Sequence, residues 1–306
     1  MNEFPPLRDD EYYRQFYAKR RFRIFEKLRS DKPRVNLLLF LATCLTTFLT
    51  GFWYNGRWQA GVWYSAAIIS ILLAHEMGHY LMCRKYGIRA TLPFFLPFPN
   101  LPPPVPMLNP FGTLGAVIRM ESLIPNRKAL FDVAVAGPLA GLALTVPAIY
   151  FGVQFSEIVD VNRENAASAL YLGESFLFAQ ISKLAIGTLP EGKDVLLHPL
   201  AFAGWAGLFV TALNLLPIGQ LDGGHVVYAL LGRKHRIVAA AALLGFAAVC
   251  IFMYRGWFLL LLLILWFGYR HPPTKDEAPI DKTRMVIGIL TLIIFVLSFT
   301  PEPFKF

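Results

Sequence analysis

Apolar residues in this chain occur in long runs that are separated by short polar segments. Uncharged or nearly uncharged runs cover residues 35–54, 60–82, 129–153, 199–217 and 237–254, and shorter ones cover 257–269 and 285–300. A helix needs about 20 apolar residues to cross the roughly 30 Å hydrocarbon core of a bilayer. The pattern therefore predicts an all-α polytopic membrane protein with six to seven transmembrane helices, the last two being short for a full crossing.

The composition supports a lipid bilayer as the surroundings of the chain. Hydrophobic residues make up 56% of the 306 residues and charged residues 16%, against about 45–50% and 25% in soluble domains. These values exclude disorder and disfavour two soluble domains. The net charge of +9 comes from basic residues beside apolar runs, so we expect no nucleic-acid partner. Cys44, Cys83 and Cys250 are odd in number and widely spaced, which predicts no disulfide partner.

The basic residues also predict the orientation of the chain. Residues 1–34 carry ten lysines and arginines, so they are expected to form a cytoplasmic tail. Alternating spans then place the 154–198 loop outside the cytoplasm. We expect residues 35–225 to form a core and residues 226–306 to form further transmembrane helices. The expected location is the cell (inner) membrane, with the functional site near the cytoplasmic side.

Two segments do not resemble ordinary spans or loops. The segment 92–115 contains eight prolines among apolar residues, and this density prevents a helix. Because its backbone would lack hydrogen bonds in lipid, the segment must be buried, line a cavity or lie at the interface. A short β-like strand is predicted at 115–120 directly after it. Apolar residues in 165–187 recur at helical spacing, which predicts a helix lying on the outer surface.

The residues that say most about function lie within the second apolar run, 60–82, in the motif His75-Glu76-Met77-Gly78-His79. On a helix, His75 and His79 are one turn apart on the same face and can bind one metal ion, while Glu76 lies beside them as a general base. Ionisable residues within a span are costly and therefore functional by default. The sequence predicts one Zn²⁺ per chain, bound by His75 and His79, with Glu76 as the catalytic residue.

A third zinc ligand is expected from a later motif. Residues 214–225 read NLLPIGQLDGGH, and Asp222 is the carboxylate in this segment. Alternation of the spans brings this motif to the same leaflet as the two histidines. Pro217 and the glycines break the helix there, which is tolerated at membrane depth only where the backbone lines a site. The alternative interpretation of Asp222 is a turn residue beside Gly223.

These motifs resemble those of the site-2 protease family of intramembrane zinc metalloproteases. The resemblance rests on HEMGH within a span, N-x-x-P-x-x-x-x-D-G-G after it, the small-residue segment AGPLAG at 136–141 and PFGTLG at 110–115. Unlike many members, this sequence shows neither a PDZ nor a CBS module. The resemblance implies hydrolysis of a peptide bond within or next to a transmembrane helix of a membrane protein substrate, as in regulated intramembrane proteolysis.

Two further elements are expected to contact the substrate. Asn214 is expected to donate a hydrogen bond to the substrate or to the developing oxyanion; its alternative role is a helix-terminal cap before Pro217. Gly115, Ala116 and Val117 are expected to pair with the unwound substrate as an added strand, a mode in which main-chain hydrogen bonds supply the affinity.

Other interpretations of the motifs are weaker. A serine or aspartyl intramembrane protease would need motifs that the sequence does not contain. A non-enzymatic membrane metal-binding protein or a divalent-metal transporter remains the alternative, although the other spans are almost bare of polar residues. His225 is expected at a span end rather than beside Asp222, whereas His198, His235 and His271 are expected in solvent. Asp132 is expected at the start of a helix.

Overall fold

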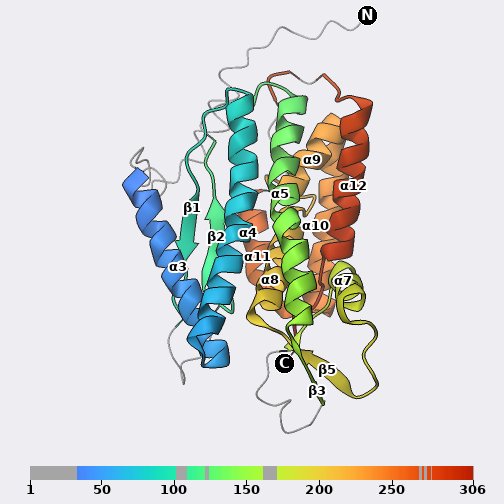
Figure 1. Cartoon of the computed structure of the whole chain (residues 1–306). Helices are drawn as coiled ribbons and strands as arrows, with labels where there is room; N and C mark the ends of the chain where they lie inside the picture. Colours follow the sequence, from blue (N-terminus) through green and yellow to red (C-terminus); the bar gives the residue numbers. More distant parts are fainter. Residues whose placement is uncertain are drawn as a thin grey trace, which may run out of the picture.

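The computed structural model describes residues 33–100, 109–120, 124–160, 171–268, 271, 274–276 and 278–305. Most of the predicted cytoplasmic tail, residues 1–32, lies outside the described residues. The described chain is a bundle of helices that lie side by side, with a β-hairpin between the first two described helices (Figure 1). The predicted class of a mainly helical membrane protein is therefore confirmed in outline.

By length and composition, four helices of the described chain can cross a membrane. They are α3 (Pro33–Asn55), α4 (Trp58–Lys85), α5 (Arg127–Gln154) and the run Asp222–Phe252, which contains α9 (Asp222–Leu231), η1 (Gly232–Lys234) and α10 (His235–Phe252). The remaining helices are α7 (Phe176–Ile186), α8 (Pro199–Asn214), η2 (Arg255–Trp257), α11 (Phe258–Phe267) and α12 (Lys282–Ser298). Each apolar run of the sequence thus contains a helix, but only four reach spanning length.

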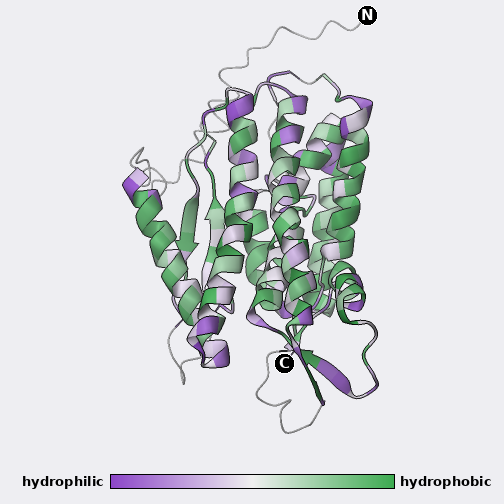
Figure 2. Cartoon of the chain, in the orientation of Figure 1, coloured by the Kyte–Doolittle hydropathy of each residue, from purple (hydrophilic) through white to green (hydrophobic). Residues whose placement is uncertain are grey.

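The outward faces of the helices are apolar, and polar residues gather at the two ends of the bundle (Figure 2). Leu38 of α3, Leu244 of α10 and Trp266 of α11 are all more than two-thirds exposed. Exposed apolar side chains on several neighbouring helices are unfavourable in water and favourable in lipid. The surface therefore fits a protein embedded in a bilayer.

The proline-rich segment forms part of a β-hairpin. Strand β1 (Phe94–Pro97) pairs with β2 (Thr113–Val117) in antiparallel register, with Phe95 opposite Ala116. Helix α3 packs on this hairpin, and the side-chain amide of Asn36 donates to the carbonyl oxygens of Leu92 and Pro93, 3.0 Å from each. The prediction that this segment is not helical is thus confirmed for its described residues, and the predicted strand begins at Thr113 rather than at residue 115. Residues 101–108 lie outside the described part.

The opposite end of the bundle carries short elements. Strand β3 (Glu157–Asp160) pairs with β5 (Lys193–Leu196), and β4 (Tyr171–Leu172) pairs with β6 (Phe304–Lys305). Helix α7 lies within the segment predicted to form a surface helix and begins later than expected because Ser175 caps its first turn. The part of the prediction at 165–170 lies outside the described residues.

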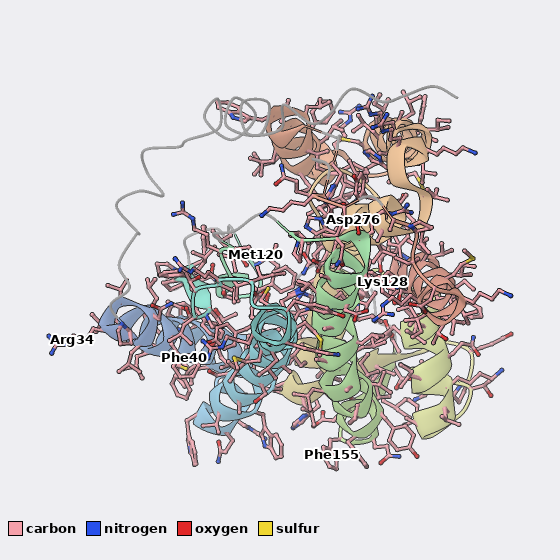
Figure 3. All side chains as sticks on the ribbon, turned by 90° about the horizontal axis from the view of Figure 1, so that it is seen from above. Arg34, Phe40, Met120, Lys128, Phe155 and Asp276 are labelled. Atoms are coloured by element: carbon pink, nitrogen blue, oxygen red, sulfur yellow. The ribbon has the colours of Figure 1, made fainter. Side chains whose placement is uncertain are left out.

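Helix α5 runs through the middle of the molecule from Lys128 to Phe155, with Arg34 and Phe40 of α3 on one side (Figure 3). Its first turns are tied to one later and one earlier helix. Arg284 of α12 donates two hydrogen bonds of 2.7 Å to the carboxylate of Asp132, which also accepts one of 2.5 Å from Tyr86. Asp132 therefore joins α5, α12 and the end of α4, which agrees with the expectation that it opens a helix rather than takes part in catalysis.

Candidate metal centre

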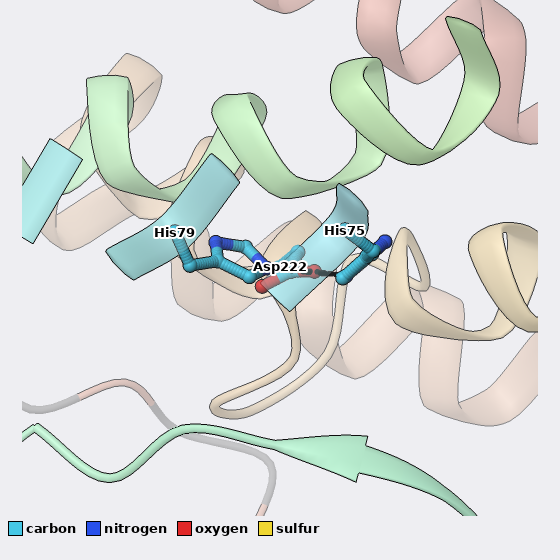
Figure 4. Close-up of side chains that lie close together, drawn as sticks. All are labelled: His75, His79 and Asp222. Atoms are coloured by element: carbon cyan, nitrogen blue, oxygen red, sulfur yellow. Dashed lines mark hydrogen bonds and ion pairs between the residues drawn. The ribbon is translucent and has the colours of Figure 1, made fainter. Parts of the chain in front are cut away.

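Three side chains that are far apart in the sequence converge inside the bundle (Figure 4). The Nε2 atoms of His75 and His79 lie 3.1 Å apart, and Oδ2 of Asp222 lies 3.3 Å from each of them. Both histidines are buried and Asp222 is nearly so. The structure thus brings together the three residues that the sequence predicts as zinc ligands.

The orientation of His79 is fixed by α5. Its Nδ1 atom lies 2.7 Å from the carbonyl oxygen of Val133. A carbonyl oxygen only accepts hydrogen bonds, so Nδ1 carries the proton and the lone pair of Nε2 is directed at the site. A metal-binding histidine usually has such a partner for its second nitrogen.

The donor set fits zinc. Zinc binds histidine nitrogen and carboxylate oxygen at about 2.0–2.2 Å, and two such ligands at a tetrahedral angle are about 3.3 Å apart. The observed separations of 3.1, 3.3 and 3.3 Å match this value. Two histidines and one carboxylate also leave a fourth position open, which is typical of catalytic rather than structural zinc sites.

Glycines allow α5 to lie directly against the two histidines. A methyl group on Gly137 would overlap the ring of His79, and one on Gly141 would lie 3.3 Å from Cβ and Nδ1 of His75. Gly78 in turn contacts the backbone of α5 at Ala136. The segment AGPLAG therefore provides a flat helix surface on which both imidazoles pack.

Asp222 reaches the site because α8 ends early. The helix stops at Asn214, and the following turn passes through Pro217 and through Gly219 at a φ of 61° before α9 begins at Asp222. A methyl group on Gly223 would overlap the carbonyl of Leu215, and Gly224 is equally crowded by the same turn. Since only glycine fits at these two positions, the start of α9 can pack on the turn and hold Asp222 beside α4.

Glu76 and Asn214 also lie at the site. Glu76 is only 6% exposed, and its carboxyl group interacts with the main-chain amide of Ile118, which directly follows β2. The side-chain amide nitrogen of Asn214 lies 3.2 Å from Nε2 of His75. Both residues thus lie beside the three donors. Gly115, Ala116 and Val117 are not among the donors; they lie in β2, which leads to Ile118.

Sequence reasoning was wrong about two histidines. His235 and His271 are 4% and 7% exposed, so they are buried rather than solvated. These predictions failed because both residues stand beside charged residues in the sequence, while the fold turns them inward. His225, expected at a span end, lies in the first turn of α9 and contacts His271. His198 is half-buried and caps α8, where its Nδ1 accepts from the amide of Leu200.

One structural residue was missed altogether. Arg127 was taken as a topology signal, yet its side chain is buried against the end of α9. No feature of the sequence distinguishes it from Lys128 beside it.

Comparisons with known proteins agree with this site. Residues 63–254 match the family described as peptidase family M50. The chain is 34% identical over 243 residues to a probable zinc metalloprotease EGY2, chloroplastic, from Arabidopsis thaliana, which covers 77% of this chain and 41% of that protein. It is 30% identical over 240 residues to a probable zinc metalloprotease EGY1, chloroplastic, from the same plant, which covers 76% and 42%.

The chain spans about two fifths of the length of these curated relatives. No solved structure matches it. The matched family range contains both the HEMGH motif and the segment around Asp222. The chain therefore belongs to peptidase family M50, the site-2 protease family of zinc metalloproteases that its motifs predict.

Proposed function

We propose that the chain is an intramembrane zinc metalloprotease that hydrolyses peptide bonds within or next to transmembrane helices of membrane proteins. The observation that carries the proposal is the triangle of His75, His79 and Asp222 within a bundle of apolar helices, with a buried glutamate beside it. A soluble peptidase would not need such a site inside helices of spanning length. The names of the relatives support the reaction class.

His75, His79 and Asp222 would hold the zinc ion through Nε2, Nε2 and Oδ2. When bound, the ion polarises the scissile carbonyl and makes the attacking water more acidic. Glu76 takes the proton of that water on its carboxylate and transfers it to the leaving amine. The Glu76 carboxylate interacts with the main-chain amide of Ile118, and Ile118 directly follows β2, so the base lies close to the hairpin on which we expect the substrate.

Asn214 is the group that we expect to bind the scissile carbonyl. Its amide lies against the Nε2 lone pair of His75, which is the atom that would bind zinc. Once that lone pair is occupied, the amide can donate to a substrate oxygen instead. The last turn of α8 and the helix break after it hold the amide in place, so little reorganisation is needed when charge develops.

Strand β2 is the element that we expect to receive the substrate. Within the described residues it pairs with β1 along one edge only, and the amide that follows it interacts with Glu76. An extended substrate pairing with Gly115, Ala116 and Val117 along the other edge would lie beside the base. Unwinding would expose the substrate carbonyls, which a helix hides.

The orientation of the chain in the membrane is part of the same proposal. The end of the bundle where α4 finishes and α5 and α12 begin carries Lys85, Lys128 and Lys282, and such basic ends face the cytoplasm. We place the chain in the cell (inner) membrane with its N-terminus in the cytoplasm and the site near that side. Seven crossings, the upper value of the predicted six to seven, result if α8 continues through its turn into α9, and α10, α11 and α12 each cross.

Reconstitution with reporter helices tests the function. The full chain in proteoliposomes should cleave some members of a panel of single-span reporters, and Asp222→Asn should abolish this cleavage. Asp160→Asn, at an exposed surface ion pair with Lys193, is the matched control and should leave cleavage intact because such pairs contribute little. Equal cleavage by wild type and Asp222→Asn would contradict the proposal.

A further inference from the structure

A second group of histidines lies beside α9, apart from the candidate metal centre. Nδ1 of His225 is 2.5 Å from Nε2 of His271, and the two rings meet edge to face with centroids 4.7 Å apart. His225 follows Asp222 by one helical turn, whereas His271 comes from the segment between α11 and α12. None of the steps proposed for peptide hydrolysis uses either imidazole.

The fold holds His271 in place independently of His225. The main-chain amide of His271 donates to Nε2 of His235 over 3.3 Å, and Nδ1 of His235 donates to the carbonyl of Gly232 over 2.8 Å. Both nitrogens of His235 are therefore used, which makes that residue a support and not a ligand. The ring of Tyr228 stacks on His271 with centroids 4.4 Å apart and planes at 22°.

The two facing nitrogens are suited to a cation. A direct contact between imidazoles can hold one proton between two lone pairs, and 2.5 Å is shorter than a normal hydrogen bond. Two histidines on a tetrahedral zinc ion have donor atoms about 3.3 Å apart, so an outward shift of His225 by about 0.8 Å would make room for the ion. His225 is only half-buried, so part of its side chain is not enclosed by the protein.

We propose that His225 and His271 form a second zinc site, with Nδ1 of His225 and Nε2 of His271 as its protein ligands and water in the remaining positions. Imidazole nitrogen is a good ligand for zinc. The site should bind more weakly than the first one, because it offers two protein ligands instead of three and lacks a carboxylate of its own. The assignment does not depend on the proteolytic function, since it concerns binding alone.

Zinc stoichiometry tests this site. The full chain in detergent is stripped with a chelator and dialysed against rising zinc concentrations, and bound zinc is measured by mass spectrometry. We expect two ions per chain in the wild type, the second bound more weakly. His271→Phe keeps the ring on Tyr228 but removes the nitrogen donors, so it and His225→Phe should each bind one ion.

Two controls separate this site from the first. Tyr228→Phe retains the stacking and should keep two ions, whereas Asp222→Asn should weaken the tight ion and keep the other. Saturation of the wild type at one ion, or two ions in both His225→Phe and His271→Phe, would overturn the second site and leave the proposed function standing. If the wild type binds the weaker ion but no tight ion, the result would contradict the proposed function and leave the second site standing.

Discussion

Arg127 at the start of α5 donates to the carbonyl oxygen of Ala229, 102 residues later, through Nε at 3.0 Å and Nη2 at 2.7 Å. Nη2 also donates to the carbonyl of Leu230 at 3.0 Å. A cation at the end of a helix satisfies carbonyls that have no partner within the helix and interacts favourably with its dipole. Because α9 begins with Asp222, Arg127 holds one end of the helix whose other end supplies a proposed zinc ligand.

Replacing Arg127 should therefore weaken zinc binding from a distance. Arg127→Ala leaves buried carbonyls without partners, which costs about 1–3 kcal/mol, and frees α9 to move. We expect the zinc dissociation constant to rise by about 10-fold, as for the loss of other groups that orient ligands. Lys128→Ala, at the exposed neighbouring position, should leave the constant unchanged. A zinc affinity that is identical in Arg127→Ala and wild type would show that α9 is positioned without it.

Because α5 packs closely against the two histidines, adding a single methyl group to α5 should have a large effect on zinc binding. Gly137→Ala places that methyl group in the ring of His79, so α5 and α4 must separate or the imidazole must turn away. Zinc content measured after purification should fall well below one ion per chain. Gly245→Ala is the matched control, because this helical glycine of α10 has open space around it; it should keep its zinc and its melting temperature.

The ion pair between Asp132 and Arg284 should stabilise the bundle without acting in catalysis. Its two parallel hydrogen bonds require the planar guanidinium group. Arg284→Lys keeps the charge but loses this geometry, so we expect a lower melting temperature, equivalent to about 1–2 kcal/mol, with zinc content unchanged. Lys282→Ala, at the exposed start of α12, should have no effect. A loss of zinc at an unchanged melting temperature would contradict a purely stabilising role.

The strand hypothesis predicts a separation of cleavage from metal binding. Successive amides of a strand point to opposite edges, so proline at Ala116 and proline at Val117 remove hydrogen-bond donors from different edges of β2. The proline that removes an amide from the edge away from β1 should reduce reporter cleavage while zinc content and melting temperature stay as in the wild type. The proline that removes an amide from the edge paired with β1 should destabilise the hairpin. If neither substitution lowers cleavage, the substrate does not pair with β2.

The sequence predicted the candidate site better than its surroundings. Spacing alone put His75 and His79 on one helix face, and the helix-breaking residues around Asp222 indicated the carboxylate that the fold brings beside them. Gly223 and Gly224 could be read as a break in the helix, but their contact with the carbonyls of the preceding turn depends on the tertiary fold.

The features that sequence reasoning missed depend on long-range packing. His271 contacts His225 across 46 positions, and no local pattern marks such a pair. Arg127 and Lys128 have similar sequence surroundings, yet one is buried and the other is exposed. A basic residue beside a span reads as a topology signal in both cases, because hydrophobic periodicity says nothing about which helix end lies opposite.

The central claim is that Glu76 moves a proton at a zinc site that His75, His79 and Asp222 form. The most direct measurement is zinc content together with reporter cleavage for Glu76→Gln, beside the wild type and Glu157→Gln, which changes an exposed glutamate of β3 in the same way. We predict one tightly bound zinc ion in all three proteins, full cleavage by Glu157→Gln, and a fall of about 10²-fold to 10⁴-fold in Glu76→Gln. Cleavage by Glu76→Gln at the wild-type rate would contradict the account.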